Sequence, residues 1–307
     1  MGRFFSKLNE KVDSVDPQST QTEFRYIDGR RYHNTENAVY PLPNDEYETD
    51  RLHIQHFLVR YIWQSNFSAP VEHILSKPDA KVLDIGCGPG SWSFDIATTY
   101  PLAKIIGLDI SPHQPTHIKP KNFEFVKANA QERLPFDDNT FDFVFQRLLV
   151  AGYTNEKWSN VVNELVRVLK PGGYLELCEG SFPIDGGPST QYLWNSITEI
   201  LTNHRNDVDV YQKIDHYLQN QGQLENIKKE EKKVYYGLKH NHIELGKAIT
   251  NNMVTATNSL KPILTKFLNI SDEEFGESVK TMEKELFEND SYNYWVRTYG
   301  RKVNDNN

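Results

Sequence analysis

The sequence has few cysteines and no long apolar run. Its only two cysteines, Cys87 and Cys178, show no spacing typical of metal ligands, so we predict neither a disulfide framework nor a zinc site and expect a reducing compartment. No apolar run approaches the roughly 18 residues of a membrane span, and no apolar signal region is recognised at the start of the sequence. We therefore expect a cytoplasmic or nuclear protein without a transmembrane segment.

An excess of positive charge is also absent. The chain carries 34 Lys and Arg against 42 Asp and Glu, which gives a net charge of -8 and a pI of about 5.7. Affinity for phosphate backbones depends on positive surface charge, so no general binding of nucleic acid is expected. With 307 residues the chain is long enough to bury a sizeable core.

The first 70 residues predict a leader, an arm and a helix. Residues 1–23 are polar and indicate a flexible leader, although their start fits the short myristoylation pattern M-G-x-x-x-S at Gly2. One acyl chain would be only a weak anchor. From Phe24 onward, aromatic and basic residues interrupted by Gly and Pro predict an ordered arm that covers another part of the molecule. A helix then begins at Asn44 or Asp45 and ends near Asn66.

The most informative stretch reads AKVLDIGCGPGSW, at residues 80–92. A short apolar strand ends in the glycine loop Gly86 to Gly90, and Ser91 to Ala97 then takes helical spacing. Glycines at alternate positions allow a sharp turn and leave no Cβ between the backbone and a ligand. The N–H groups at the helix start can hold an anion, for which we expect a carboxylate. A dinucleotide fingerprint would require glycine where Ser91 stands, so the loop disfavours an NAD-type oxidoreductase.

Two acids flank this loop. Asp84 lies at the end of the first strand, and Asp109 closes the next predicted strand, which begins at Lys104. An acid at the tip of the second strand suits hydrogen bonds to both hydroxyls of a ribose in doubly wound nucleotide folds. D-I-G-C-G-P-G followed by G-L-D-I resembles the nucleotide half of class I S-adenosylmethionine (SAM) methyltransferases.

Further strands and helices alternate along the chain. Strands are predicted at 122–126, 141–145 and 174–179, with an amphipathic helix at 156–169 that stops at K-P-G-G. This alternation predicts a parallel sheet whose ligand lies at the carboxyl ends of the strands. The glycine loop, Asp109, Asn129 and Gln146 then share one rim.

The resemblance extends from residue 24 to about residue 180. L-P-F-D-D-N-T-F-D-F-V at 134–144 and V-L-K-P-G-G-Y-L-E-L at 168–177 are similar to later motifs of the same enzymes. G-R-R-Y-H at 29–33 and L-P-N-D-x-x-E-x-D-R-L at 42–52 resemble the fungal TAM-domain, or LaeA-like, methyltransferases. This resemblance implies a Rossmann-like α/β fold with a mostly parallel seven-stranded sheet, an antiparallel last strand, an N-terminal arm and a helical lid.

The resemblance also implies the residues that bind the cofactor SAM, which is the methyl donor. Asp84 and the loop would face its methionine part, Asp109 its ribose, Asn129 and the Ala130 N–H its adenine, and Gln146 its amine through a carbonyl. Many relatives carry Asp at position 129, and Asn keeps the acceptor oxygen but loses the charge. The full predicted cofactor set is Asp84, Gly86, Cys87, Gly88, Gly90, Asp109, Ile110, Asn129, Ala130 and Gln146.

The second half of the chain is expected to determine which substrate binds. We predict one methyltransferase domain at 24–307, with 24–70 as arm and helix and 78–182 as the SAM-binding core. Residues 186–290 of this domain are predicted to form the lid or substrate region. The sequence predicts helices at 191–204, 208–219 and 243–268 and strands at 232–238 and 292–301. The family implies that the last strand inserts antiparallel between the fifth and sixth. The charged run at 228–233 is interpreted as solvated surface.

No residue is assigned as catalytic, because methyl transfer mainly requires alignment and exclusion of water, and a base only where the acceptor must lose a proton. Arg147, Glu176 and Glu179 lie near the predicted rim, where a functional and a structural role are both open. The same holds for Tyr32 and His33 on the arm, as a cover for adenine or as packing.

Two short patterns are set aside. His53 and His56 lack a third ligand, so no metal is assigned. Tyr153 and Lys157 form a Y-x-x-x-K pair that we interpret as chance.

The leading hypothesis is a SAM-dependent methyltransferase whose acceptor, a small molecule or a protein side chain, the sequence leaves open. The alternative is a regulatory, methyltransferase-like protein that controls secondary metabolism through partners.

Overall fold

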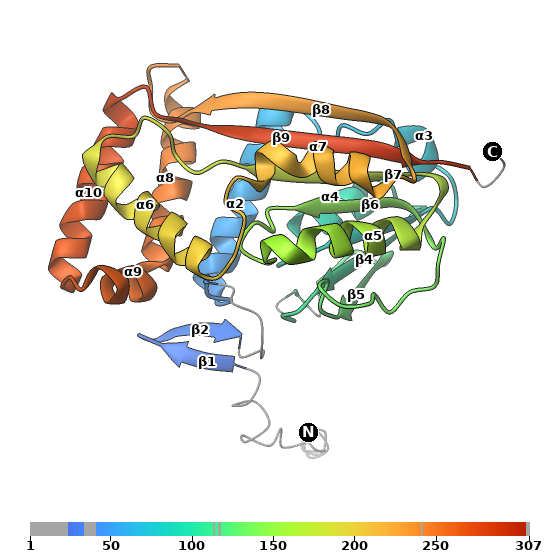
Figure 1. Ribbon diagram of the computed structural model, residues 1–307, viewed down its shortest axis with the longest axis horizontal. Helices are drawn as coiled ribbons and strands as arrows, with labels where there is room; N and C mark the ends of the chain where they lie inside the picture. The colour runs from blue at the N-terminus through green and yellow to red at the C-terminus, as the bar shows by residue number, and fades with distance from the viewer. Residues whose placement is uncertain (1–23, 34–40, 113, 116–117, 241, 305–307) are drawn as a thin grey trace, which may run out of the picture.

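A seven-stranded sheet forms the centre of the molecule (Figure 1). The computed structural model describes residues 24–33, 41–112, 114–115, 118–240 and 242–304, so the expected leader at 1–23 and its Gly2 lie outside the described residues. The strand order is β5-β4-β3-β6-β7-β9-β8. The strands are β3 Lys81–Ile85, β4 Lys104–Asp109, β5 Phe123–Lys127, β6 Phe141–Arg147, β7 Leu169–Gly180, β8 Leu224–Tyr235 and β9 Tyr292–Lys302.

The pairing of these strands confirms the expected fold class. β3 lies parallel to both β4 and β6, and β6 is parallel to β7. β9 inserts between β7 and β8 and is antiparallel to both. Because β3 and β4 run in register, with Ile85 opposite Leu108, the glycine loop after β3 and the tip of β4 meet at one edge of the sheet.

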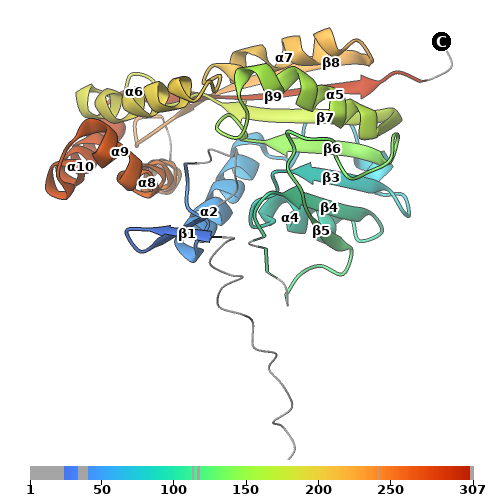
Figure 2. The same cartoon turned by 60° about the horizontal axis from the view of Figure 1, so that its bottom comes forward.

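Helices cover both faces of the sheet and one of its ends. They are α2 Glu46–Trp63, α3 Glu72–Leu75, α4 Ser91–Thr99, the 3-10 helix η1 Asn155–Lys157, α5 Trp158–Val168, α6 Pro188–Asn203, α7 Val210–Gln221, α8 Ile243–Ser259, α9 Lys261–Leu268 and α10 Asp272–Glu288. Figures 1 and 2 show α6, α8, α9 and α10 gathered at one end of the sheet, with α2 between them and the strands.

The strand sequence decides which face each side chain covers. Successive residues of a strand point to opposite faces, so Val82 belongs to the apolar cluster that includes residues of α3 and α4, while Leu83 belongs to the one that includes residues of α5 and α7. On the α4 face, the ring of Trp92 stacks on Phe145 with centroids 4.0 Å apart. The two apolar clusters together account for the buried core on either side of the sheet.

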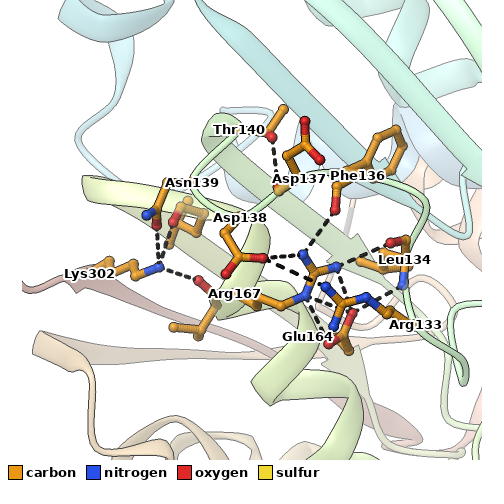
Figure 3. A network of polar contacts seen from close by, with 12 residues as sticks. Arg133, Leu134, Phe136, Asp137, Asp138, Asn139, Thr140, Glu164, Arg167 and Lys302 are labelled. Atoms are coloured by element: carbon orange, nitrogen blue, oxygen red, sulfur yellow. Dashed lines mark hydrogen bonds and ion pairs between the residues drawn. The ribbon is translucent and has the colours of Figure 1, made fainter.

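A polar network fastens the connection between β5 and β6 to α5, away from the glycine loop (Figure 3). Arg167 of α5 forms ion pairs with Glu164 and Asp138, and its guanidinium donates to the main-chain oxygens of Leu134 and Phe136. The nearly buried ammonium of Lys302 donates to three oxygens beside the end of α5. These contacts fix the course of the chain into β6.

The predicted arm contains an antiparallel hairpin. β1 Phe24–Ile27 pairs with β2 Arg30–His33, joined by Asp28 and Gly29, which both have positive φ. An Asp-Gly turn of this kind matches the twist of the flanking strands. Asp45 ties the hairpin to α2, because it pairs with Arg30 and also accepts a hydrogen bond from the main-chain N–H of Glu48 as the N-cap.

Two sequence predictions in the second half were wrong in detail, and one helix was missed. The helix predicted at 243–268 is two helices, because the chain turns at Leu260 and Pro262 starts α9. The sixth strand runs from Leu224 to Tyr235, rather than 232–238, and includes the charged run. α10 was not predicted, although Ser271 and Glu274 form a capping box at its start.

Candidate functional site

A cavity of about 320 Å³ lies at the carboxyl ends of the parallel strands. The glycine loop, the tip of β4 and the segments that follow β5 and β6 form one side, and α2, α6 and α8 form the other. The volume is in the range of small-molecule sites, which are mostly apolar with a few placed polar groups. The cavity therefore lies where the parallel sheet predicts a ligand.

The glycine loop has a backbone that only glycine adopts readily. Gly86, Gly88 and Gly90 have φ values of 64°, 54° and 86°. A Cβ at Gly86 would lie 2.7 Å from a methyl carbon of Leu149. The N–H groups of Gly86 and Cys87 both donate to the main-chain oxygen of Leu108, at 2.8 and 3.1 Å, which holds the loop against β4.

Asp109 connects this loop to the segment after β4. One carboxylate oxygen accepts from the Gly88 N–H and the other from the Ser111 N–H, each at 2.9 Å. A carboxylate offers about four acceptor sites, so each oxygen keeps capacity for a ligand hydroxyl. Asp109 lines the cavity with this capacity in place.

Asp84 is buried at the end of β3 and also lines the cavity. The hydroxyl of Ser93 donates to it at 2.6 Å. Burial raises the pKa of Asp84 to about 7, although Ser93 and the nearby positive charge of Arg147 oppose the rise. A cationic group of a ligand would favour the ionised form of this carboxyl.

Eight of the ten predicted cofactor residues line the cavity. They are Asp84, Gly86, Cys87, Gly88, Asp109, Ile110, Asn129 and Ala130. The side-chain oxygen of Asn129 accepts from the N–H of Gln131 at 3.0 Å, which shapes the turn after β5. Burial raises the pKa of the Cys87 thiol well above its usual value, so this residue is a neutral part of the wall.

Gly90 and Gln146 are not among the cavity-lining residues. Gly90 starts α4, where a Cβ would lie 3.0 Å from the ring of Phe94. Gln146 is fully buried, and its side-chain oxygen accepts from the hydroxyl of Tyr153 at 3.1 Å. Because neighbours along a strand face opposite ways, Phe145 and Arg147 line the cavity while the Gln146 side chain packs on the other face.

The sequence prediction missed most of the wall opposite the loop. The arm contributes 41–44, and the side-chain amide of Asn44 donates to the Ser111 hydroxyl at 2.8 Å, which joins the arm to the segment after β4. No local pattern shows such a contact, although the sequence did predict helices where α2, α6 and α8 lie. The apolar part of this wall consists of Leu42, Leu52, Trp194, Ile197, Leu201, Met253, Ala256 and Leu260.

The three charged candidates near the rim differ in surroundings. Glu176 is buried and accepts from the N–H groups of Ser68 and Ala69, and burial raises its pKa to about 7. Glu179 is buried, accepts from the Leu149 N–H at 2.8 Å, and has a pKa raised to about 8 by burial. Neither is among the cavity-lining residues, whereas Arg147 is. A structural role fits the two glutamates.

The remaining candidates have partners or positions of their own. Tyr32 is 1% exposed and is not among the cavity-lining residues, which fits packing of the arm. The hydroxyl of Ser91 lies 2.7 Å from His53 Nδ1, and His56 lies 3.2 Å from Asp95. Tyr153 is buried beside Gln146.

Comparisons with known proteins agree with the geometry. Residues 82–173 match the family model described as "Methyltransferase domain". The secondary metabolism regulator laeA of Aspergillus niger is 35% identical over 157 residues, which cover 50% of this chain and 40% of that protein. The methyltransferase pytC of Aspergillus terreus is 35% identical over 164 residues, with 52% and 48% covered. The protein-methionine methyltransferase laeA of Emericella nidulans is 32% identical over 167 residues, with 53% and 42% covered.

The fold, the glycine loop and these matches make the chain similar to the class I SAM-dependent methyltransferases. The curated relatives it matches include proteins named laeA and pytC. The chain spans less than half the length of the curated relatives it matches. Across the part that the structure describes, no helix is both long and apolar enough to cross a membrane.

Proposed function

We propose that this protein transfers a methyl group from SAM to an acceptor bound in the same cavity. The observation that carries the proposal is the arrangement of the loop and Asp109. A backbone turn with glycine at alternate positions faces a carboxylate that keeps acceptor capacity, and both border one cavity. The methionine part of SAM needs the close approach, and its ribose needs the acceptor.

The roles of the lining residues follow from their positions. Asp84 would attract the ammonium of the methionine part, and Asp109 would accept hydrogen bonds from the ribose hydroxyls. Ile110, Asn129 and Ala130 would hold the adenine. Bound in this way, SAM supplies an electrophilic methyl group, and the protein contributes orientation and exclusion of water.

The acceptor would lie against the apolar wall from α2, α6 and α8. The part of this wall that comes from α6 and α8 lies within residues 186–290, which we propose as the substrate region. The wall suits an acceptor with an apolar body. No side chain in the cavity is assigned as a base, which is needed only where the acceptor must lose a proton.

The direct test is calorimetric titration of SAM and of its demethylated product, S-adenosylhomocysteine. Asp109→Ala removes the proposed ribose acceptor and the tie between two loops, and we expect binding to weaken by about 10- to 100-fold. Asp137→Ala, at an exposed position, is the matched control and should bind as the unchanged protein does. Absence of SAM binding to the unchanged protein would refute the proposal. Binding would justify an acceptor screen with labelled methyl groups.

A regulatory role is the second candidate, because two of the relatives above are named for laeA, one of them as a regulator of secondary metabolism. Gly88→Asp separates the two candidates, since Gly88 has a positive φ and its N–H bonds to Asp109. If the protein acts by catalysis, this variant loses both SAM binding and its cellular effect. A cellular effect that survives in a folded variant without SAM binding would favour action through partners.

A further inference from the structure

Among the described residues, four charged side chains line the cavity, and three of them are held by partners within the fold. Arg51 pairs with Glu48 through two nitrogens. Asp109 accepts from two backbone N–H groups, and Asp84 accepts from a serine hydroxyl. Arg147 is the fourth, and within the described residues no carboxylate forms an ion pair with its guanidinium. Its recorded side-chain contact there is with His56 Nδ1, 3.5 Å from Nη2.

The contact with His56 orients this guanidinium rather than neutralising it. His56 is fully buried, and burial lowers its pKa, so the ring is neutral near pH 7. With Nε2–H donating to Asp95 at 3.2 Å, Nδ1 is left to accept from Arg147. This chain of contacts runs from α4 through α2 to the end of β6.

The guanidinium of Arg147 is half-buried, and no ion pair with a described carboxylate compensates for the water that it has lost. Burial lowers the pKa of Arg147, and the positive charge of Arg297 acts in the same direction. A desolvated charge is costly unless an opposite charge compensates for it. An anionic ligand in the cavity would supply that compensation, and a planar guanidinium matches a carboxylate in a two-pronged hydrogen bond.

We propose that Arg147 is the anion-binding residue of this cavity and that its ligand is a carboxylate. The proposal rests on the proposed methyl transfer for the identity of the ligand. The carboxylate comes either from the methionine end of SAM or from the methyl acceptor. A more highly charged phosphate fits less well, because one guanidinium faces it and Asp84 lies close enough to act on the charge of Arg147.

The position of Asp84 makes the methionine end a specific candidate. In the parallel pairing of β3 and β6, Asp84 lies opposite Phe145, two residues before Arg147 and on the same face. The carboxyl of Asp84 and the guanidinium of Arg147 therefore lie near each other at the strand ends, and the described residues show no direct ion pair between them. This arrangement suits the ammonium and the carboxylate of one amino acid.

The test compares ligands that differ only in a carboxylate, using Arg147→Gln and the exposed control Arg133→Gln. The first arm measures SAM against decarboxylated SAM by calorimetry. The second measures octanoate against octanol through tryptophan fluorescence, since Trp92, Trp194 and Trp295 line the cavity. We expect the unchanged protein and the control to prefer the carboxylate by about 10- to 100-fold in one arm, and Arg147→Gln to lose that preference.

The arm that responds identifies the source of the carboxylate. A response to SAM assigns Arg147 to the cofactor, and a response to octanoate alone assigns it to the acceptor. Equal preferences in Arg147→Gln and in the unchanged protein, in both arms, would overturn the proposal. Arg147→Lys keeps the charge without the fork and replaces the Gln variant if that fails to fold, with a partial loss expected. Failure of the proposed function would be distinguished from failure of this proposal, because the unchanged protein would then bind neither SAM nor adenosine.

Discussion

Gly86→Ala tests whether the glycine loop requires glycine for its conformation, for its close approach to Leu149, or for both. An alanine at the φ of 64° would have a left-handed backbone, which destabilises the folded state by about 1 to 2 kcal/mol. Its Cβ would also lie 2.7 Å from Leu149 Cδ2 and 2.9 Å from Cδ1. Overpacking of this kind costs about 1 to 3 kcal/mol. We expect a total loss of about 2 to 5 kcal/mol in the free energy of unfolding.

Gly222→Ala is the matched control. Gly222 has a φ of 84° after α7, and a Cβ there would meet nothing within 4 Å. Its cost is therefore the backbone part alone, about 1 to 2 kcal/mol, and the effect of alanine on the unfolded chain cancels between the variants. Urea unfolding at constant m-value measures the difference. Equal losses in the two variants would show that the approach of Leu149 has no energetic consequence.

The same substitution carries a consequence for binding. Leu149 lines the cavity, so a new methyl group at Gly86 displaces it into the space that the ligand occupies. The ligand must reverse this displacement, and SAM affinity is expected to fall by about tenfold or more. Gly222→Ala should leave that affinity unchanged.

Two other predictions concern stability. Burial raises the folded-state pKa of Glu179 to about 8, above its ordinary value of 4.5, so the folded state holds this proton more tightly and stability falls as pH rises between these values. Between pH 5.5 and 7.5 the free energy of unfolding should therefore fall less steeply with pH in Glu179→Gln than in the unchanged protein, by about 1.4 kcal/mol per pH unit, and urea unfolding measures both slopes. The exposed control Glu124→Gln should keep the slope of the unchanged protein. The same slope in Glu179→Gln would contradict this reasoning. Lys302→Met leaves three oxygens beside the end of α5 without their ammonium donor (Figure 3) and should cost about 2 kcal/mol. A loss no larger than that of exposed Lys121→Met would show that water replaces the ammonium.

The first half of the fold was predictable because its signals are local. Short apolar runs that end in glycine or acid mark β3 and β4, and the apolar stripe from Trp158 onward marks α5. The order of the strands followed from the family resemblance, which placed the last strand antiparallel beside β7. The position of the loop and of Asp109 at one edge of the sheet was predictable from the strand pattern, since each follows or closes a predicted strand.

The second half was harder because its burial is decided by distant residues. β8 carries four exposed charged residues in a row at 228–231, which hide the alternation of a strand. The strand forms because the backbone of β9 pairs with it along one edge, and among the described residues its other edge is the free edge of the sheet. Arg147 is a similar case, since its contact with His56 joins residues far apart in sequence. The period-two pattern of β6, applied from Phe145, does place Arg147 on the cavity side.

The position of β9 has a consequence for synthesis of the chain. Among the described strands β9 is the last to be made, yet it lies between β7 and β8. Until residues 292–302 have left the ribosome, β7 and β8 have no partner in common and each presents an open edge. Pairing across such a sequence separation is slow, and open edges favour aggregation. Chaperone demand should therefore be highest after β8 has emerged and before residues 292–302 have done so.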